Sequence, residues 1–191
     1  MFNEKASPTD AVSAGLVART GFSEQSRAGG VFHVQCLDKD GNLKWETSKH
    51  NLVVNEGLQN MNTQYFKGST YTAAFFLGLV TGPASGTTFA AADTLASKAW
   101  TEFTDYSGSR KAVTFGTATT ADPSVISNSA APSSFTISGA GGVVAGAFLC
   151  TVSSGTSGVL FSESDFQSPG DRTVVSGDTL NVTYTFSLDA A

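Results

Sequence analysis

The sequence predicts a mainly β protein: an antiparallel β-sandwich or jelly roll with one short helix and an extended N-terminal arm. Three observations predict this fold class. Many segments alternate apolar and polar residues with the period of two that a half-buried strand requires, and clusters of Gly, Ser and Asn separate them. No alternation of strands with helices, the signature of a parallel sheet, is present. A chain of 191 residues suits one domain with an arm attached.

The chain divides into an arm over residues 1–30 and a sandwich or jelly-roll domain over residues 31–191. Residues 1–30 mix Ser, Ala, Gly and single charges without a sustained period and end on Arg27-Ala28-Gly29-Gly30. Such a segment is either a disordered tail or a segment that becomes ordered on the surface of a partner.

The domain opens with a predicted hairpin. Residues 31–36 and 43–47 each alternate apolar and polar side chains on either side of the turn-forming residues 38–42. Asp38, Asp40 and Asn42 superficially resemble a calcium loop. The glycine is the fourth residue of this segment, not the sixth, and no Glu stands at the twelfth position, so a turn is the better interpretation.

One helix is expected. Residues 50–55 form a short strand, and Asn55 then caps a helix whose apolar residues share one face. These residues are Leu58, Met61, Tyr65 and Phe66.

The rest of the domain reads as strands. Residues 71–80 are continuously apolar, which is typical of a strand covered on both faces in the middle of a fold. The Thr-, Ser- and Ala-rich residues 116–132 either hold a short strand near Val125 or form an exposed loop that meets a partner. Residues 138–142 are expected to be a hairpin connection. Further strands are expected at residues 112–115, 134–138, 143–152, 159–162 and 173–175.

The last strand gives the clearest pattern. Five apolar residues alternate with Asn181, Thr183, Thr185 and Ser187, so they point to one face: Leu180, Val182, Tyr184, Phe186 and Leu188. Each fully buried large side chain contributes roughly 1.5–3 kcal/mol, so this face is expected to be a major part of the core.

Composition excludes several functions. The net charge is −5, the sequence pI is about 4.8, and the few basic residues are scattered, which argues against nucleic-acid binding. No segment reaches the roughly 18 apolar residues of a membrane span, and no signal-peptide pattern is visible, so the chain is expected to fold in the cytosol.

No residue stands out as a catalytic, cofactor-binding or metal-binding group. Cys36 and Cys150 lie far apart and are expected to fill strands as small hydrophobes, with a single disulfide between them as the alternative. His33 and His50 are too few for a multi-histidine metal site and are expected to be structural or exposed.

The remaining motifs are also weak. Glu102 and Asp105 are the nearest candidates for a glycosidase pair, but their aromatic surroundings equally suit a strand edge. The glycines at 138–142 lack the Lys of a phosphate-binding loop, no GxSxG motif occurs, and the sequon at Asn181 lies in a strand. We therefore expect a protein that is not an enzyme and needs no cofactor.

Five segments together resemble a family of tailed-bacteriophage virion proteins, the capsid decoration (cement) proteins. They span about three quarters of the chain, and residues 1–30 show no match to the family. The segments are residues 50–58 (HNLVVNEGL), 76–80 (FLGLV), 100–106 (WTEFTDY), 146–149 (GAFL) and 175–184 (VSGDTLNVTY).

The resemblance implies a structural protein on the outer surface of the virion head. Such a protein is commonly a homotrimer, binds the major capsid protein and holds neighbouring capsid subunits together. The main alternative is a receptor-binding module of a head or tail fibre, although neither heptads nor repeats are visible. A tail-associated hydrolase would require a cluster of acidic residues or histidines.

Overall fold

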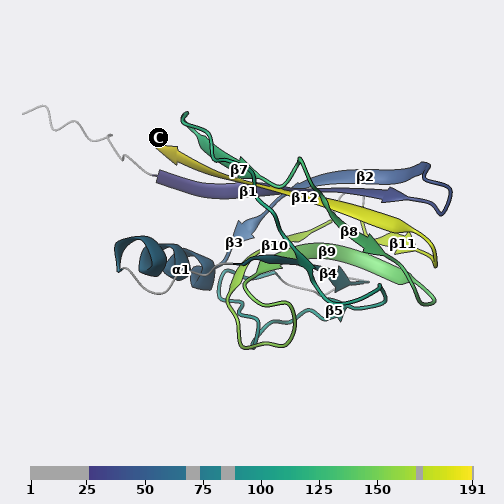
Figure 1. Ribbon diagram of the computed structural model, residues 1–191. Coiled ribbons are helices and arrows are strands. Elements are labelled where there is room, and N and C mark those ends of the chain that lie inside the picture. Colours follow the sequence, from purple (N-terminus) through teal and green to yellow (C-terminus); the bar gives the residue numbers. More distant parts are fainter. Residues whose placement is uncertain (1–25, 68–73, 83–88, 167–169, 191) are drawn as a thin grey trace, which may run out of the picture.

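The structure is a computed structural model that describes residues 26–67, 74–82, 89–166 and 170–190 (Figure 1). The described residues are mainly β, with one helix. The elements are β1 (Ser26–Leu37), β2 (Leu43–His50), β3 (Leu52–Val53), α1 (Asn55–Phe66), β4 (Phe76–Thr81), β5 (Glu102–Phe103), β6 (Lys111–Ala112), β7 (Ser124–Ser127), β8 (Ser133–Thr136), β9 (Gly142–Cys150), β10 (Leu160–Asp165), β11 (Arg172–Val174) and β12 (Thr179–Ala190).

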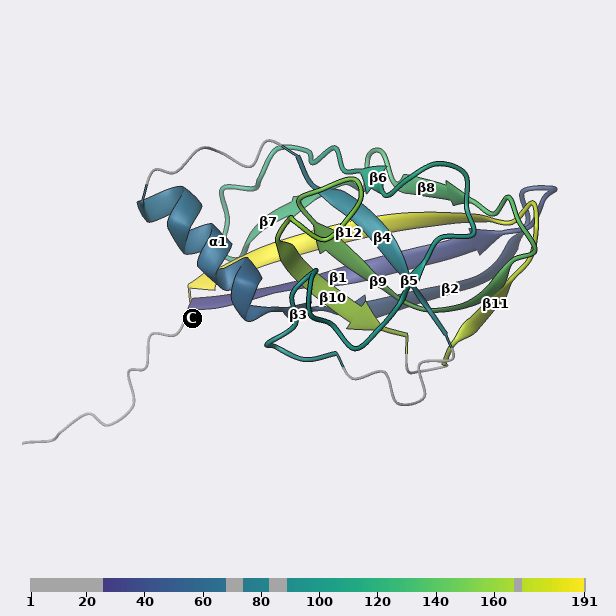
Figure 2. The same ribbon diagram turned by 90° about the horizontal axis from the view of Figure 1, so that it is seen from below.

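Two antiparallel sheets lie face to face, consistent with the predicted β-sandwich. Among the described residues, the first sheet has five strands in the order β2-β1-β12-β7, with β8 also paired to β12. The second has seven, in the order β3-β10-β9-β4-β5, with β11 paired to β9 and β6 paired to β4. Figure 2 shows the second sheet in front of the first.

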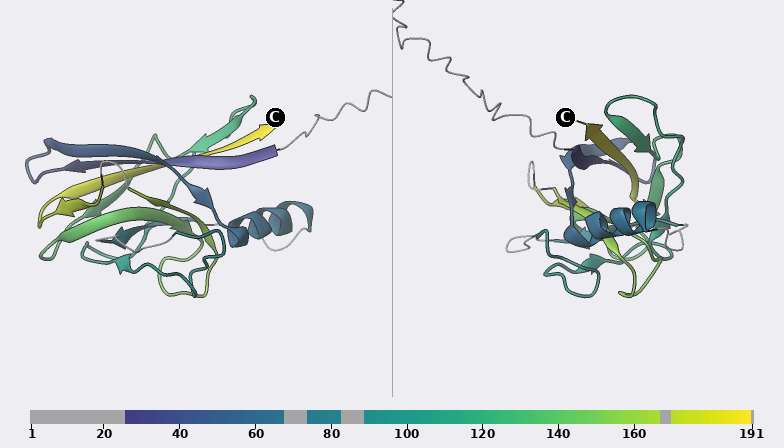
Figure 3. Two further views of the ribbon diagram at one scale, coloured as in Figure 1. Left: turned by 180° about the vertical axis from the view of Figure 1, so that it is seen from behind. Right: turned by 90° about the vertical axis from the view of Figure 1, so that its left-hand side faces the viewer.

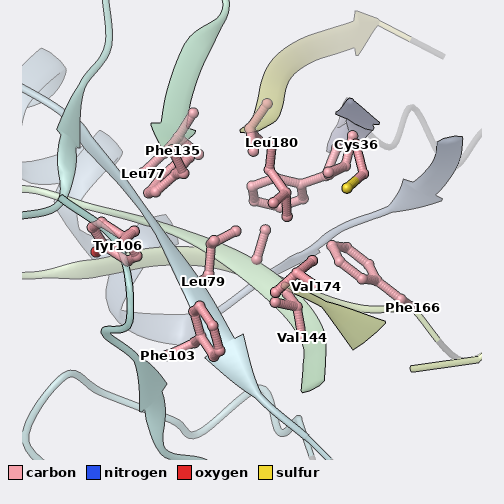
Figure 4. Close-up of a cluster of buried hydrophobic side chains, with 14 of the residues drawn as sticks. Cys36, Leu77, Leu79, Phe103, Tyr106, Phe135, Val144, Phe166, Val174 and Leu180 are labelled. Carbon is pink, nitrogen blue, oxygen red and sulfur yellow. The ribbon is translucent and has the colours of Figure 1, made fainter. Parts of the chain in front are cut away.

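The core lies between the sheets and is built by alternation along the strands. Leu180 and Val182 of β12 are fully buried and belong to the same cluster as Leu77 and Leu79 of β4. Figure 4 shows such side chains from the two sheets pointing toward one another. The predicted inward face of the last strand is therefore confirmed for its first half, whereas Leu188 remains 47% exposed.

The second sheet is covered on its outer face as well. A separate cluster on that side includes Val80 of β4, Phe148 of β9 and, from the segment that covers them, Leu95 and Trp100. This arrangement explains why residues 76–80 are apolar without alternation, as expected for a strand buried on both faces. Residues 71–73 of that prediction lie outside the described residues.

The predicted hairpin is confirmed as β1 and β2. The Asp38 carboxylate accepts hydrogen bonds from the backbone N–H groups of Asp40 and Asn42, both at 2.9 Å. Gly41 has a φ of 85°, a conformation that favours glycine. The acidic residues therefore form a turn, as the position of the glycine indicated.

The predicted arm boundary at residue 30 is wrong, because β1 already begins at Ser26. Residues 1–25 of the predicted arm lie outside the described residues. Gly29 and Gly30, which suggested flexibility, pair with Ser187 and Phe186 of β12. At Gly30 a Cβ atom would clash with the carbonyl oxygen of Thr185, so this glycine permits a close approach of two chains.

The predicted helix exists, but its cap and its apolar face differ from expectation. Val54 is the N-cap residue, no side chain caps the helix, and Asn55 is the first helical residue. Gly57 faces β10, where a Cβ atom would clash with the carbonyl oxygen of Phe161. Met61 packs against the core, but Tyr65 and Phe66 do not, because α1 projects beyond the end of the sheets (Figure 3).

Two connections also differ. Residues 138–142 do not join a hairpin: they lead from β8 in the first sheet to β9 in the second. Of the two interpretations of residues 116–132, the short strand near Val125 is confirmed as β7, and residues 116–123 before it are exposed.

The neighbouring glycines of β1 give a matched test of this packing. Gly30→Ala is expected to lower the free energy of unfolding by about 1–3 kcal/mol, because the new methyl group overlaps the Thr185 carbonyl. For Gly29, no atom of the described residues other than its chain neighbours lies within 4 Å of the Cβ position. Gly29→Ala should therefore change the free energy by at most about 0.5 kcal/mol. Urea unfolding measures both, and equal losses would contradict the register of β1 on β12.

Candidate functional site

The two carboxylates considered as a glycosidase pair both have internal partners. Glu102 accepts two hydrogen bonds from the Arg110 guanidinium, from Nε at 2.9 Å and from Nη2 at 2.7 Å. Asp105 accepts a hydrogen bond of 2.6 Å from the backbone N–H of Gly141. Each carboxylate is thus held in a structural contact, and the geometry does not support a catalytic pair.

Arg110 is buried and links three parts of the chain. Besides Glu102, its guanidinium donates to the carbonyl oxygens of Val152 at 3.2 Å and Gly155 at 3.0 Å. Its central carbon lies 5.2 Å from the centroid of the Phe148 ring, within the range of a cation–π contact. Arg110 therefore fastens the β9–β10 loop to the segment that precedes β6.

Both cysteines are buried and free, which confirms their interpretation as small hydrophobes rather than a disulfide. Cys36 lies on the first sheet and Cys150 on the second. Burial raises the pKa of the Cys36 thiol to about 11, and burial also raises the pKa of Cys150. Neither thiol is therefore a reactive thiolate at neutral pH.

The histidines lie on the first hairpin. His33 Nδ1 and the Ser48 hydroxyl are 2.8 Å apart, while the backbone carbonyl of His50 accepts a hydrogen bond from the Ser164 hydroxyl. Within residues 26–67, 74–82, 89–166 and 170–190, no group of three or more His, Cys, Asp or Glu side chains could hold a metal ion.

A buried pair of acidic side chains, Glu163 on β10 and Asp93, was not predicted from the sequence. Glu163 is fully buried, and its Oε2 accepts a hydrogen bond of 2.7 Å from the indole N–H of Trp100. Its Oε1 receives no hydrogen bond from an N–H or hydroxyl group of the described residues. The side chain of Asp93, which is 9% exposed, lies beside it.

This environment favours the protonated form of Glu163. Burial is the main cause that raises the pKa of the Glu163 carboxyl to about 8; the Trp100 hydrogen bond lowers this pKa, and the charge of Asp93 raises it. A proton on Glu163 allows a hydrogen bond between the two carboxyl groups. Catalytic acids also have raised pKa values, but they contact substrate, whereas Glu163 is inaccessible to solvent.

The one signal in the sequence for this pair was a charged residue directly after a predicted strand. Glu163 stands between Ser162 and Ser164, just past the predicted strand at 159–162. Glu163 is buried only because the segment around Trp100 covers the outer face of the second sheet. The position of that segment was not predicted from the sequence.

Exposed apolar side chains gather on α1. We call Tyr65 and Phe66, in the last turn of α1, the apolar tip; Leu58, which is 39% exposed, lies in the first turn. Tyr65 is 78% exposed and Phe66 80%, and their rings contact each other edge-to-face with centroids 5.0 Å apart. The helix projects from the sandwich at the end where β12 also finishes, so the apolar tip stands clear of both sheets (Figures 1 and 3).

No family model, no curated protein and no solved structure matches this chain. In the described part of the chain, α1 is too short and too polar to cross a membrane, and no other helix is present there. The function must therefore be argued from the chemistry of the chain itself.

The Glu163 cluster predicts a specific dependence of stability on pH. The folded protein holds the Glu163 proton up to about pH 8, whereas the unfolded chain releases it near the ordinary value of 4.5. Between these values the unfolded state binds fewer protons, so the free energy of unfolding falls as the pH rises. Each pKa unit corresponds to about 1.4 kcal/mol.

Urea unfolding at several pH values between 4.5 and 8 measures this slope. Glu163→Gln is expected to remove the fall over that range, while Glu46→Gln, at an exposed position, is the control that should retain it. Asp93→Asn should move the fall to lower pH, because it removes a charge that raises the pKa of Glu163. A variant Glu163→Gln with an unchanged slope would show that Glu163 is ionised in the folded protein.

Arg110 gives a second prediction for stability. Arg110→Met is expected to cost about 3 kcal/mol, the low end of the range for buried pairs, because the Glu102 side chain is still 20% exposed. The control is Lys39→Met, whose partner Asp40 is 63% exposed; it should cost less than about 1 kcal/mol. Similar losses in thermal or urea unfolding would mean that Arg110 contributes no more than a surface ion pair.

Proposed function

We propose that this chain is a structural protein of a tailed-bacteriophage virion, a capsid decoration protein that binds the outer surface of the head and is not an enzyme. The observation that supports the proposal most directly is the apolar tip. Tyr65 and Phe66 are about four fifths exposed at the end of a projecting helix. Binding to a partner would remove this apolar surface from water. Tyr and Phe are also enriched where proteins associate.

The internal use of polar groups supports binding over catalysis. The buried ionisable side chains Arg110, Asp178 and Glu163 contact Glu102, Lys44 and Trp100, respectively, inside the fold. Such contacts fix the shape of the molecule. A rigid sandwich with an exposed apolar projection is suited to docking on a repeated surface.

The segments that resemble the decoration family coincide with central elements. Residues 76–80 lie in β4, residues 146–149 in β9, and residues 175–184 form the turn before β12 together with its first half. The resembling residues 50–58 also reach the first turn of α1, whereas Tyr65, Phe66 and the exposed residues 116–123, the proposed contacts, lie outside the resemblance.

The proposed partners are the major capsid protein and further copies of this chain. A head presents the same contact many times, so a closed homotrimer can engage several capsid subunits at once. Linked contacts of this kind hold neighbouring subunits together even when each is weak, which is the action proposed for this protein.

The location of the protein tests the proposal first. Immunogold labelling or cryo-EM of virions is expected to place the protein on the outside of the head. Labelling confined to the tail would contradict decoration and would favour the alternative, a fibre receptor-binding module.

The apolar tip is tested by the paired substitution Tyr65→Ser and Phe66→Ser. Loss of two central aromatic contacts is expected to weaken binding to heads that lack the protein by at least about 30-fold. The fold should be unaffected, because both side chains are exposed. The control is Leu43→Ser, in the β1–β2 hairpin, where Leu43 is 54% exposed; it should bind as the natural chain does. If the variant fills all binding sites on the heads in a sedimentation assay, the apolar tip does not contribute to binding.

A further inference from the structure

An apolar cavity of about 140 Å³ lies between the two sheets. Its lining includes aromatic rings from both sheets and one aliphatic side chain of β7: Phe75, Phe115, Phe161, Tyr184, Phe186 and Ile126. Phe161 packs edge-to-face on Phe75 and on Phe186, with ring centroids 5.6 Å apart in both pairs. The described residues thus form an aromatic cage.

The cavity suits one phenyl ring that carries no polar group. An apolar cavity of about 150 Å³ stays dry and accepts benzene. The Tyr184 hydroxyl accepts hydrogen bonds from Asn51 at 2.8 Å and from Ser162 at 3.1 Å, so an occupant finds no free polar partner among the lining side chains. Ile126 and Phe186 are only half-buried, so a ring can enter from the side that these residues form.

The cavity and the apolar tip belong to the same end of the sandwich. Phe161 lines the cavity, and its backbone carbonyl is the group that Gly57 of α1 approaches. From Gly57 to Phe66 the helix extends by about 14 Å at the rise of an α-helix, away from both sheets (Figures 1 and 3). Phe66 therefore cannot reach the cavity of its own chain, but it is free to enter the cavity of another copy.

Of the two rings in the apolar tip, Phe66 is the one that matches the cavity. Its side chain is 80% exposed and wholly apolar. The Tyr65 hydroxyl would lose its hydrogen bonds to water inside a cavity that offers no free polar partner, which costs free energy. Tyr65 contacts Phe66 edge-to-face, so it lies beside the mouth of the cavity when Phe66 enters.

The area that such a contact removes from water is sufficient for a specific interface. Tyr65 and Phe66 are 78% and 80% exposed. At about 200 Å² for an aromatic side chain, one tip buries about 300 Å² and covers a similar area of the copy that receives it. In a closed assembly each copy gives one tip and receives another, and so loses about 600 Å². A specific interface needs roughly 500 Å² from each partner.

We propose that this contact joins copies of the chain: Phe66 of one copy fills the aromatic cage of the next. The tip and the cavity are different surfaces, so the contact repeats around a ring until the ring closes. A ring of three copies is the homotrimer of the proposed function, and the apolar tip then strengthens head binding by linking copies. The number of copies rests on the proposed function, whereas the contact itself does not depend on a place in the virion.

Sedimentation equilibrium of the purified chain tests the contact. The natural chain is expected to form a closed oligomer, whereas Phe66→Ser should need a concentration at least about 30-fold higher to associate, because a central aromatic anchor is lost. Leu43→Ser, at an exposed position in the β1–β2 hairpin, is the control and should associate as the natural chain does. A natural chain that is monomeric at about 1 mM overturns the proposal. Labelling of the tail alone would instead reject the proposed function and leave this contact standing.

Two further measurements locate the docking site. Benzene fits the same cavity and needs no substitution, so saturating benzene is expected to dissociate the natural oligomer. Ile126→Trp places an indole ring in the cavity and should abolish association. Val125→Trp, on the opposite face of β7, is its matched control and should associate as the natural chain does. Association that persists both in benzene and in Ile126→Trp would mean that the apolar tip docks elsewhere, which overturns the proposal.

Discussion

The structure depends on one constraint: the second sheet is covered on both faces. Leu77 and Leu79 of β4 face the first sheet, while Val80 faces the segment that contains Leu95 and Trp100. Water is therefore absent from both sides of the central strands, and every polar group on them needs an internal partner or a neutral form. The covering segment has little regular structure of its own, so it must be attached by side chains.

Two polar contacts supply that attachment, and both follow from the constraint. Trp100 reaches from the covering segment to Glu163 on β10, and Arg110 reaches from the same side to the carbonyl groups of the β9–β10 loop. In water these contacts would contribute little, because each group would bond equally well to solvent. In the buried layer they matter more for stability, because removing one group would leave the other buried without a hydrogen bond, at the full cost of its desolvation. The same dryness raises the pKa of Glu163.

The sequence predicted the strands and turns that depend on local periodicity. It did not predict the contacts that depend on how the sheets and the covering segment are layered. The β1–β2 hairpin and the last strand follow from alternation and turn residues, and the apolar run in β4 correctly indicated a strand covered on both faces. The short strand at Val125 was one of two interpretations of residues 116–132. Glu163, Arg110 and the cover around Trp100 depend on contacts between residues far apart in the chain. Gly30 was assigned to a flexible segment because the sequence alone does not distinguish a glycine that permits two strands to approach closely from a glycine in a loop.

The exposed end of the molecule follows from the same layering. The first sheet has one buried face, and the residues of β12 that alternate with the buried ones, Asn181, Thr183 and Thr185, suit contact with water. The second sheet has no face left for α1, so the helix contacts the sandwich through Gly57 and Met61 and then continues past its edge. Its exposed aromatic residues, Tyr65 and Phe66, are typical of a helix that binds a surface. The described residues leave Tyr65 and Phe66 exposed, and this exposure is the reason why we propose that a partner covers them.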